Sequence, residues 1–259
     1  VLSYLSLGFV PAPGTGMTGV HKLPPAHMLV RENGRTHVTR YWQIDFRCKA
    51  ERSIEEWKEV VRGEVRAAVR RRLVSDVPLG AFLSGGIDSS IVVACMAEAS
   101  SRVETFSIGF EHEAYDERQH ARVVAQAFGT SHHEFVVRAE VAEMLPTLAV
   151  AFDEPYADSS ALPSWFLARE TRRHVTVALN GDGGFAGYSR YARLCGRDRL
   201  ARWIRPLGLR SLTGAASRAD GWLPPRTRRL LEGLHGLLAP GFGERYAWTV
   251  SLFSGLELA

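Results

Sequence analysis

One short segment of this sequence combines residue types that bind anions and metal ions. It reads Ser84-Gly85-Gly86-Ile87-Asp88-Ser89-Ser90 and follows an apolar run that ends at Leu83. Glycines let the backbone approach an anion closely, and the unpaired N–H groups at a helix start, together with the helix dipole, attract it. The three serines add hydroxyl donors. Asp88 alone would repel a phosphate, so we interpret it as a ligand of Mg²⁺ that bridges to phosphates.

A second glycine-rich segment follows another β-branched run. Val175–Leu179 leads into Asn180-Gly181-Asp182-Gly183-Gly184. In open parallel sheets, ligands bind beyond the carboxyl ends of the strands, and both glycine-rich segments are expected there. The first segment is not a Walker P-loop, because the Gly-Lys-Ser/Thr ending is missing. The simpler alternative, a serine-rich helix cap, accounts for a bare Ser-Gly-Gly better than for this longer pattern.

The elements that would position these segments alternate between strands and helices. Strands are expected at 79–83, 103–110, 133–137 and 175–179, and helices at 53–73, 89–99, 116–128, 141–151 and 163–172. Ser53 and Glu56 form a capping box at the start of the first helix. The alternation predicts a doubly wound, parallel α/β sheet. Before it, residues 1–45 are rich in proline and glycine, and Asn33-Gly34 between two strand-like stretches predicts a hairpin.

Composition excludes several classes of protein. Charged residues make up 23% of the 259 residues and no apolar run reaches 18 residues, so we expect a globular protein without a membrane span. The three cysteines, an odd and widely spaced set, favour neither a disulfide framework nor a zinc site, and a reduced cytoplasmic setting is expected.

The arginines between 190 and 229 have helical spacing, which favours solvated helix faces over a nucleic-acid surface. The sequence does not define an oligomeric state.

The serine-rich loop resembles the pyrophosphate loop of the N-type ATP pyrophosphatases, whose fold is of the adenine nucleotide α-hydrolase kind. The flanking residues narrow the resemblance to the synthetase domain of glutamine-hydrolysing asparagine synthetases. It is carried, in order, by Pro11-Ala12-Pro13, Lys22-Leu23-Pro24-Pro25, Tyr41-Trp42, Asp76-Val77-Pro78-Leu79-Gly80, Thr105–Phe110, Tyr115-Asp116-Glu117, Thr130–Glu134, Asp153-Glu154-Pro155, Asp158–Pro163 and Asn180–Gly184. It covers most of the chain to about Arg193.

This resemblance implies a domain that adenylates the side-chain carboxylate of aspartate with Mg-ATP, after which ammonia gives asparagine, AMP and pyrophosphate. It places Leu83 and Ile108 at the adenine and Gly181 at the nucleotide. The predicted ATP and pyrophosphate site comprises Leu83, Ser84, Gly85, Gly86, Asp88, Ser89, Ser90, Ile108, Asn180 and Gly181. Asp88 and Asp182 are the predicted catalytic residues and Mg²⁺ ligands. The cofactors implied are ATP and Mg²⁺, without nucleic-acid or membrane partners.

Three departures from the family pattern predict impaired activity. After Gly184, where the family reads Asp-Glu-Leu-Phe, this sequence continues directly with Phe185, so the second metal-binding carboxylate is lost unless Asp182 replaces it. None of the cysteines is an N-terminal nucleophile, so free ammonia would replace glutamine. The family places a lysine near the reacting phosphate in the later part of the domain, whereas no lysine follows Lys58 in this sequence. We expect a fragment, with residues 1–46 as the end of a glutaminase-type β domain plus linker and residues 47–259 as an incomplete ATP-binding domain.

Other interpretations stay open at this stage. The substrate could be another carboxylate, as in β-lactam synthetase-like ligases, or the chain could be a nucleotide-binding remnant without turnover. Asp153-Glu154 could be a carboxylate pair near the substrate or simply a helix end. Adjacent His132 and His133 on a strand point to opposite faces, so we expect structural or solvated roles rather than binding of one metal ion by both. Cys95 is expected to be a small buried hydrophobe, and Tyr188 and Tyr191 to be packing residues.

Overall fold

The computed structural model describes residues 2–45, 47, 49–110, 116–137, 141–184, 195–196, 199–203, 227, 234 and 237–239. The chain divides into two compact units. Among the described residues, the first unit contains 2–24, Glu154–Ala157, 195–196, 199–203, 227, 234 and 237–239, and the second contains those of Pro25–Asp153 and 158–184. The predicted boundary between residues 46 and 47 stays a prediction.

The first unit joins the start of the chain to the short stretch Glu154–Ala157. It contains the helix α1 (Leu2–Leu7). The Ala157 N–H donates to the Gly8 carbonyl over 2.9 Å. The Lys22 ammonium forms an ion pair with Glu154 and also donates to the Val10 carbonyl over 2.6 Å. Glu154 is thus committed to a structural ion pair, while Asp153 follows the end of a helix with a left-handed φ of 56°.

A two-stranded hairpin opens the second unit. Strands β1 (His27–Glu32) and β2 (Arg35–Arg40) pair antiparallel, with Glu32 opposite Arg35. The two linking residues, Asn33 and Gly34, have φ values of 49° and 74°. Positive φ at both central residues is the pattern of a type I′ turn. The hairpin predicted from Asn33-Gly34 is therefore confirmed.

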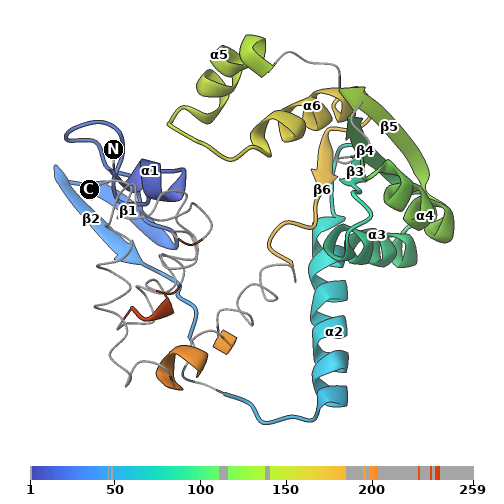
Figure 1. Cartoon of the computed structure of the whole chain (residues 1–259), viewed down its shortest axis with the longest axis horizontal. Helices are drawn as coiled ribbons and strands as arrows, with labels where there is room; N and C mark the ends of the chain where they lie inside the picture. Colours follow the sequence, from blue (N-terminus) through green and yellow to red (C-terminus); the bar gives the residue numbers. More distant parts are fainter. Residues whose placement is uncertain are drawn as a thin grey trace. The chain divides into compact units, whose positions relative to one another are not determined.

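A four-stranded sheet forms the centre of the second unit (Figure 1). Its strands are β3 (Leu79–Phe82), β4 (Glu104–Phe110), β5 (Ser131–Val137) and β6 (Val177–Leu179), arranged in the order β5-β4-β3-β6. Every neighbouring pair is parallel. The chain leaves β3 toward β4 and β5 and returns to its other side with β6. This confirms the predicted parallel α/β class and places a topological switch point between β3 and β6.

The described helices of this unit are α2 (Ile54–Arg72), α3 (Ile87–Ala99), α4 (Arg118–Phe128), α5 (Val141–Phe152) and α6 (Ala161–Thr171). Of these, α3, α4 and α6 contact the strands of the sheet, whereas α2 packs mainly on α3 and α5 packs mainly on α6 (Figure 1). The main core joins Val69 of α2 with Val93 and Met96 of α3, and with Ala81 of β3 and Leu83 directly after it. On the other face, Phe106 is fully buried and stacks on His133, with ring centroids 5.1 Å apart.

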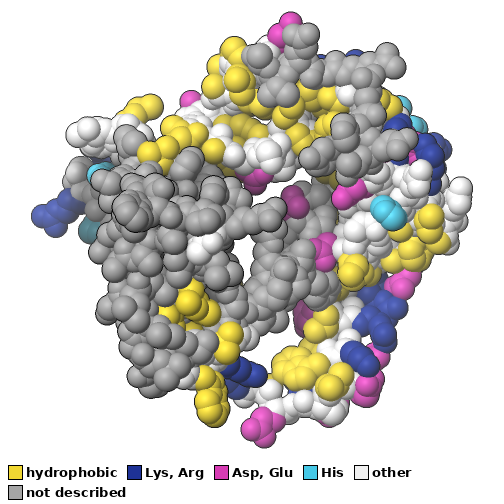
Figure 2. Space-filling model, viewed as in Figure 1, with side chains coloured by type: hydrophobic (Ala, Val, Ile, Leu, Met, Phe, Trp, Pro, Cys, Tyr) yellow, Lys and Arg dark blue, Asp and Glu magenta, His cyan; other side chains and the backbone are white. Residues whose placement is uncertain are grey.

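The N-terminal half of α2 has an apolar stripe that the described residues leave uncovered. Ile54, Trp57 and Val61 are exposed, and Figure 2 shows apolar side chains there beside acidic and basic ones. With Ile91 and Cys95 of α3 they line a groove of about 520 Å³. Cys95 itself is buried, as predicted, and burial raises the pKa of its thiol. The α2 helix starts at the predicted capping box of Ser53 and Glu56.

Several element boundaries differ from the sequence prediction, for local reasons. The last strand starts at Val177, because the Val175 N–H still donates to the Thr171 carbonyl of the preceding turn, over 3.0 Å. The strand β5 starts at Ser131, because its pairing with β4 runs through Ser131. The helix α4 starts at Arg118, because the Asp116 carboxylate accepts the Arg118 N–H from outside the helix.

Candidate nucleotide-binding site

The serine-rich segment forms the turn that joins β3 to α3. The Leu83 N–H donates to the Phe106 carbonyl over 2.8 Å and so extends the β3–β4 pairing by one residue. Gly85 then adopts a φ of 79°, which L-residues with side chains rarely adopt. Gly86 is the N-cap, with φ −68° and ψ 160°, and the helix begins at Ile87. The predicted sequence of strand, glycine turn and helix start is therefore present.

The serine hydroxyls hold this turn in shape. The Gly86 N–H donates to Ser84 Oγ over 3.2 Å, and the Ser84 N–H donates to Ser89 Oγ over 3.3 Å. The hydroxyls of Ser89 and Ser90 both donate to the Gly86 carbonyl, over 3.2 and 2.7 Å. Ser89 is only 8% exposed. These bonds order the turn before any ligand arrives, so the backbone N–H groups at the start of α3 hold a fixed geometry for an anion.

The second glycine-rich segment packs directly against the start of α3. A Cβ added to Gly181 would lie 2.6 Å from the Ser89 nitrogen and 2.8 Å from the Asp88 carbonyl carbon. A Cβ added to Gly184 would lie 2.9 Å from the carboxyl carbon of Asp88. Only glycine permits these approaches. The two segments, about 90 residues apart in sequence, therefore meet at the switch point between β3 and β6, where open α/β sheets bind their ligands.

The two predicted carboxylates occupy different environments. Asp88 is half-buried in the first turn of α3, beside Gly181 and Gly184. Asp182 is exposed and accepts a hydrogen bond from the Asn180 amide over 3.0 Å, while its own N–H donates to Asn180 Oδ1 over 3.2 Å. The described residues contain no cluster of three or more metal-ligating side chains. The assignment of Mg²⁺ to Asp88 and Asp182 stays a prediction.

Residues 60–249 match the family model for asparagine synthase. The chain belongs to the asparagine synthase family. It is 36% identical to asparagine synthetase [glutamine-hydrolyzing] 1 of Bacillus subtilis over 196 residues, which cover 73% of this chain and 30% of that protein. It is 35% identical to putative asparagine synthetase [glutamine-hydrolyzing] 2 of Methanocaldococcus jannaschii over 219 residues, which cover 79% of this chain and 42% of that protein.

The chain is also similar to a protein named for a different reaction. Over 201 residues, the chain is 30% identical to amidase chyE of Penicillium rubens, with 68% of this chain and 30% of that protein covered. The chain thus spans less than half the length of the curated relatives it matches here. In the part of the chain that the structure describes, no helix is both long and apolar enough to cross a membrane.

The adenine contacts implied by membership of the asparagine synthase family lie on neighbouring strands. Leu83 is 1% exposed and its side chain belongs to the core, so a ligand would meet its backbone rather than its side chain. Ile108 is half-buried near the carboxyl end of β4 and pairs with Phe135 of β5. Both residues thus lie at the carboxyl edge of the sheet, on the side of β3 away from β6. Their contact with adenine stays a prediction.

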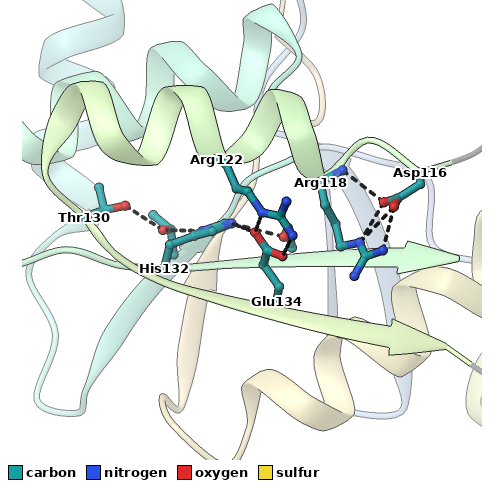
Figure 3. A network of polar contacts seen from close by, with 8 residues as sticks. Asp116, Arg118, Arg122, Thr130, His132 and Glu134 are labelled. Carbon is teal, nitrogen blue, oxygen red and sulfur yellow. Dashed lines mark hydrogen bonds and ion pairs between the residues drawn. The ribbon is translucent and has the colours of Figure 1, made fainter. Parts of the chain in front are cut away.

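An ion pair at the start of α4 also lies at this edge, and the sequence did not predict it. The Asp116 carboxylate binds the Arg118 guanidinium through two parallel contacts, from Nε to Oδ1 over 2.8 Å and from Nη2 to Oδ2 over 2.6 Å (Figure 3). The Arg118 hydrogen bonds hold the pKa of Asp116 at about 2. The pair packs on Gly109 of β4, whose missing Cβ would lie 2.1 Å from Arg118 Nε. The signal in the sequence is Gly109 itself, because a glycine near the end of a strand can mark the close approach of another part of the chain.

The adjacent histidines have structural roles on opposite faces of the sheet, as predicted. His132 is hydrogen-bonded through Nδ1 to Thr105 and through Nε2 to Ser107, at 2.9 and 3.2 Å (Figure 3). Burial lowers its pKa. His133 binds Glu104 over 2.8 Å on the Phe106 face. The family pattern has Asp-Glu-Leu after the residue that corresponds to Gly184, where this chain continues with Phe185. Phe185, Tyr188 and Tyr191 lie outside the described residues.

Proposed function

We propose that this chain binds Mg-ATP where the two glycine-rich segments meet and transfers its adenylyl group to the side-chain carboxylate of aspartate. Ammonia then displaces AMP to form asparagine. The observation that carries this proposal is the packing of Gly181 and Gly184 on Asp88 and Ser89, which joins the two family motifs into one site. Family membership supports the ATP-dependent ligase class. Aspartate, ammonia and a cytoplasmic location are parts of the proposal.

The chemistry needs little from the protein beyond position and charge. A carboxylate oxygen of aspartate attacks the α-phosphorus, the bond between the α and β phosphates breaks, and pyrophosphate leaves. The N–H groups at the start of α3 would hold the departing pyrophosphate, because unpaired donors at a helix start bind anions. Ammonia then attacks the acyl carbon and AMP carries away the former carboxylate oxygen. Fixed donors lower the barrier because they need no reorganisation during the reaction.

The environment of Asp88 fits a magnesium ion. Mg²⁺ is usually held by one or two carboxylates together with substrate phosphates. We call Ser84–Gly86, between β3 and α3, the phosphate loop. Asp88 is a half-buried carboxylate in the first turn of α3, directly after this loop. The ion would neutralise phosphate charge when bound. Asp182 would join this role only if its side chain leaves the hydrogen bond from Asn180.

A second candidate function is nucleotide binding without turnover. It is favoured by the direct passage from Gly184 to Phe185, which omits the acidic residues of the family pattern, and by the absence of lysine after Lys58. Both candidates share the same nucleotide site and differ in catalysis. A related ligase acting on another carboxylate remains the alternative within the enzyme class, and an amidase name among the relatives keeps that alternative open.

The test is release of pyrophosphate from Mg-ATP in the presence of aspartate and ammonium. The chain is compared with a variant that carries Asp-Glu-Leu inserted after Gly184. Aspartate-dependent release from the chain itself would support the ligase. Release from the insertion variant alone would support a nucleotide-binding scaffold that lacks a carboxylate. If neither releases pyrophosphate with aspartate, a panel of other carboxylates decides between a different substrate and a site without ligase chemistry.

A further inference from the structure

The first turn of α4 touches two separate parts of the proposed nucleotide site. A Cβ added to Gly85, in the phosphate loop, would lie 2.4 Å from the carbonyl carbon of His120 and 2.6 Å from the Ala121 nitrogen. A Cβ added to Gly109, at the end of β4, would lie 2.1 Å from Arg118 Nε. Within the start of α4, His120 and Ala121 therefore lie against the phosphate loop, and Arg118 lies against the strand that carries Ile108.

The Asp116–Arg118 pair is largely buried and held by several hydrogen bonds, so it can act as a spacer between the phosphate loop and the end of β4. The side chains of Asp116 and Arg118 are 19% and 21% exposed. Besides the two contacts of the guanidinium, the Arg118 N–H donates to Asp116 Oδ1 over 3.2 Å, so the carboxylate binds both the side chain and the backbone of Arg118. One turn further along, Arg122 binds Glu134 of β5 through Nε and Nη2, at 2.5 and 2.6 Å. This second pair fixes α4 to the sheet (Figure 3).

We propose that Arg118, held by Asp116, is a positioning residue that sets the distance between the end of β4 and the phosphate loop. The inference rests on the proposed function, in which the adenine lies beside Ile108 and the phosphates lie at the loop. ATP contacts both the end of β4 and the phosphate loop, so its binding depends on the distance between them. Free pyrophosphate contacts the loop alone. Arg118 reaches the nucleotide through Gly109 and the α4 backbone and does not itself bind phosphate.

The test compares two ligands on the same variants. Arg118→Gln removes the positive charge of the pair and keeps a shorter, polar side chain, and Asp116→Asn removes the negative charge while keeping the shape of its side chain. Both variants are expected to weaken binding of Mg-ATP by about fivefold, because a partly exposed charge pair is worth little more than this. Both should leave the binding of Mg-pyrophosphate unchanged. Isothermal titration calorimetry measures both ligands, and circular dichroism checks that each variant is folded.

A matched control is available in Arg66, which binds Glu98 with the same two-contact geometry, at 2.9 and 2.9 Å, away from the loop. Arg66→Gln should change neither affinity. Equal weakening of both ligands by Arg118→Gln would overturn the inference, because it would make Arg118 a direct phosphate ligand or a general stabiliser. Unchanged ATP binding in both variants would overturn it as well. An unaltered chain that binds neither ligand would instead overturn the proposed function.

Discussion

Gly181 offers a direct test of the contact that joins the two glycine-rich segments. Its backbone is not in the left-handed region, so alanine is acceptable there on conformational grounds. The added methyl group would nevertheless lie 2.6 Å from the Ser89 nitrogen, and an ordinary contact begins at 3.4 Å. The start of α3 and the segment after β6 must therefore separate by roughly 0.8 Å, and the obstructing atoms belong to the backbone. Overpacking of this kind costs about 1–3 kcal/mol of folding free energy.

The same displacement should damage nucleotide binding more than stability. A misplacement near 1 Å in a site built on positioning can cost about 100-fold in reaction rate, and we expect an effect of similar size on a ligand held by fixed backbone donors. We therefore expect Gly181→Ala to weaken Mg-ATP binding by about 10- to 100-fold. Calorimetric titration with Mg-ATP gives the affinity, and urea unfolding gives the loss of stability.

Two other glycines separate the possible causes. Gly183 has a φ of 79° but no atom within 4 Å of an added Cβ, so Gly183→Ala isolates backbone strain from steric overlap. Gly16 has neither feature, so Gly16→Ala should be silent. If Gly181→Ala binds Mg-ATP as tightly as the unaltered chain and unfolds at the same urea concentration, the packing described at the switch point is wrong.

Three further outcomes follow from particular contacts. Ser53→Ala removes the side-chain half of the capping box on α2 and should lower the free energy of unfolding by about 1 kcal/mol, measured by urea denaturation. Burial lowers the pKa of His132 below its usual 6.5, so the unfolded chain binds more protons and stability falls as the pH drops below 6.5. In His132→Gln, the part of the decrease in unfolding free energy that comes from this histidine, between about pH 7.5 and about pH 5.5, should disappear. An unchanged dependence of the unfolding free energy on pH would show that His132 is not responsible. Asp88→Asn keeps the shape of the side chain but removes its charge, so magnesium should no longer strengthen ATP binding in titrations with and without the metal; a persisting magnesium effect would place the ion elsewhere.

The sequence predicted the local features of this fold well, because each depends on neighbouring residues. Asn33-Gly34 specifies its turn by the positive φ that both residues accept. Ser53 and Glu56 specify a helix start through reciprocal hydrogen bonds. The run from Leu83 through Gly86 to Asp88 specifies a strand, a glycine turn and a helix start. The parallel class of the sheet also follows, since alternating strands and helices favour a parallel sheet.

The contacts that depend on distant residues were not predictable in the same way. Nothing near Gly109 in sequence shows that Arg118 fills the space beside it, since the approach arises only when α4 packs on the sheet. The burial of Leu83 in the core was missed because an apolar strand end reads the same whether its side chain faces the core or a ligand. The ion pair of Lys22 with Glu154 joins residues more than 130 positions apart. Turns, helix starts and strands set by neighbouring residues were therefore easier to predict from the sequence than the packing contacts around them.

We propose that the two glycine-rich segments form one nucleotide site at the switch point. Titration of the chain with Mg-ATP, repeated in the presence of excess pyrophosphate, tests this. We expect saturable binding of one nucleotide per chain, and we expect pyrophosphate to compete with ATP for the loop between β3 and α3. No binding, or ATP binding that pyrophosphate leaves unchanged, would show that the two segments do not form such a site.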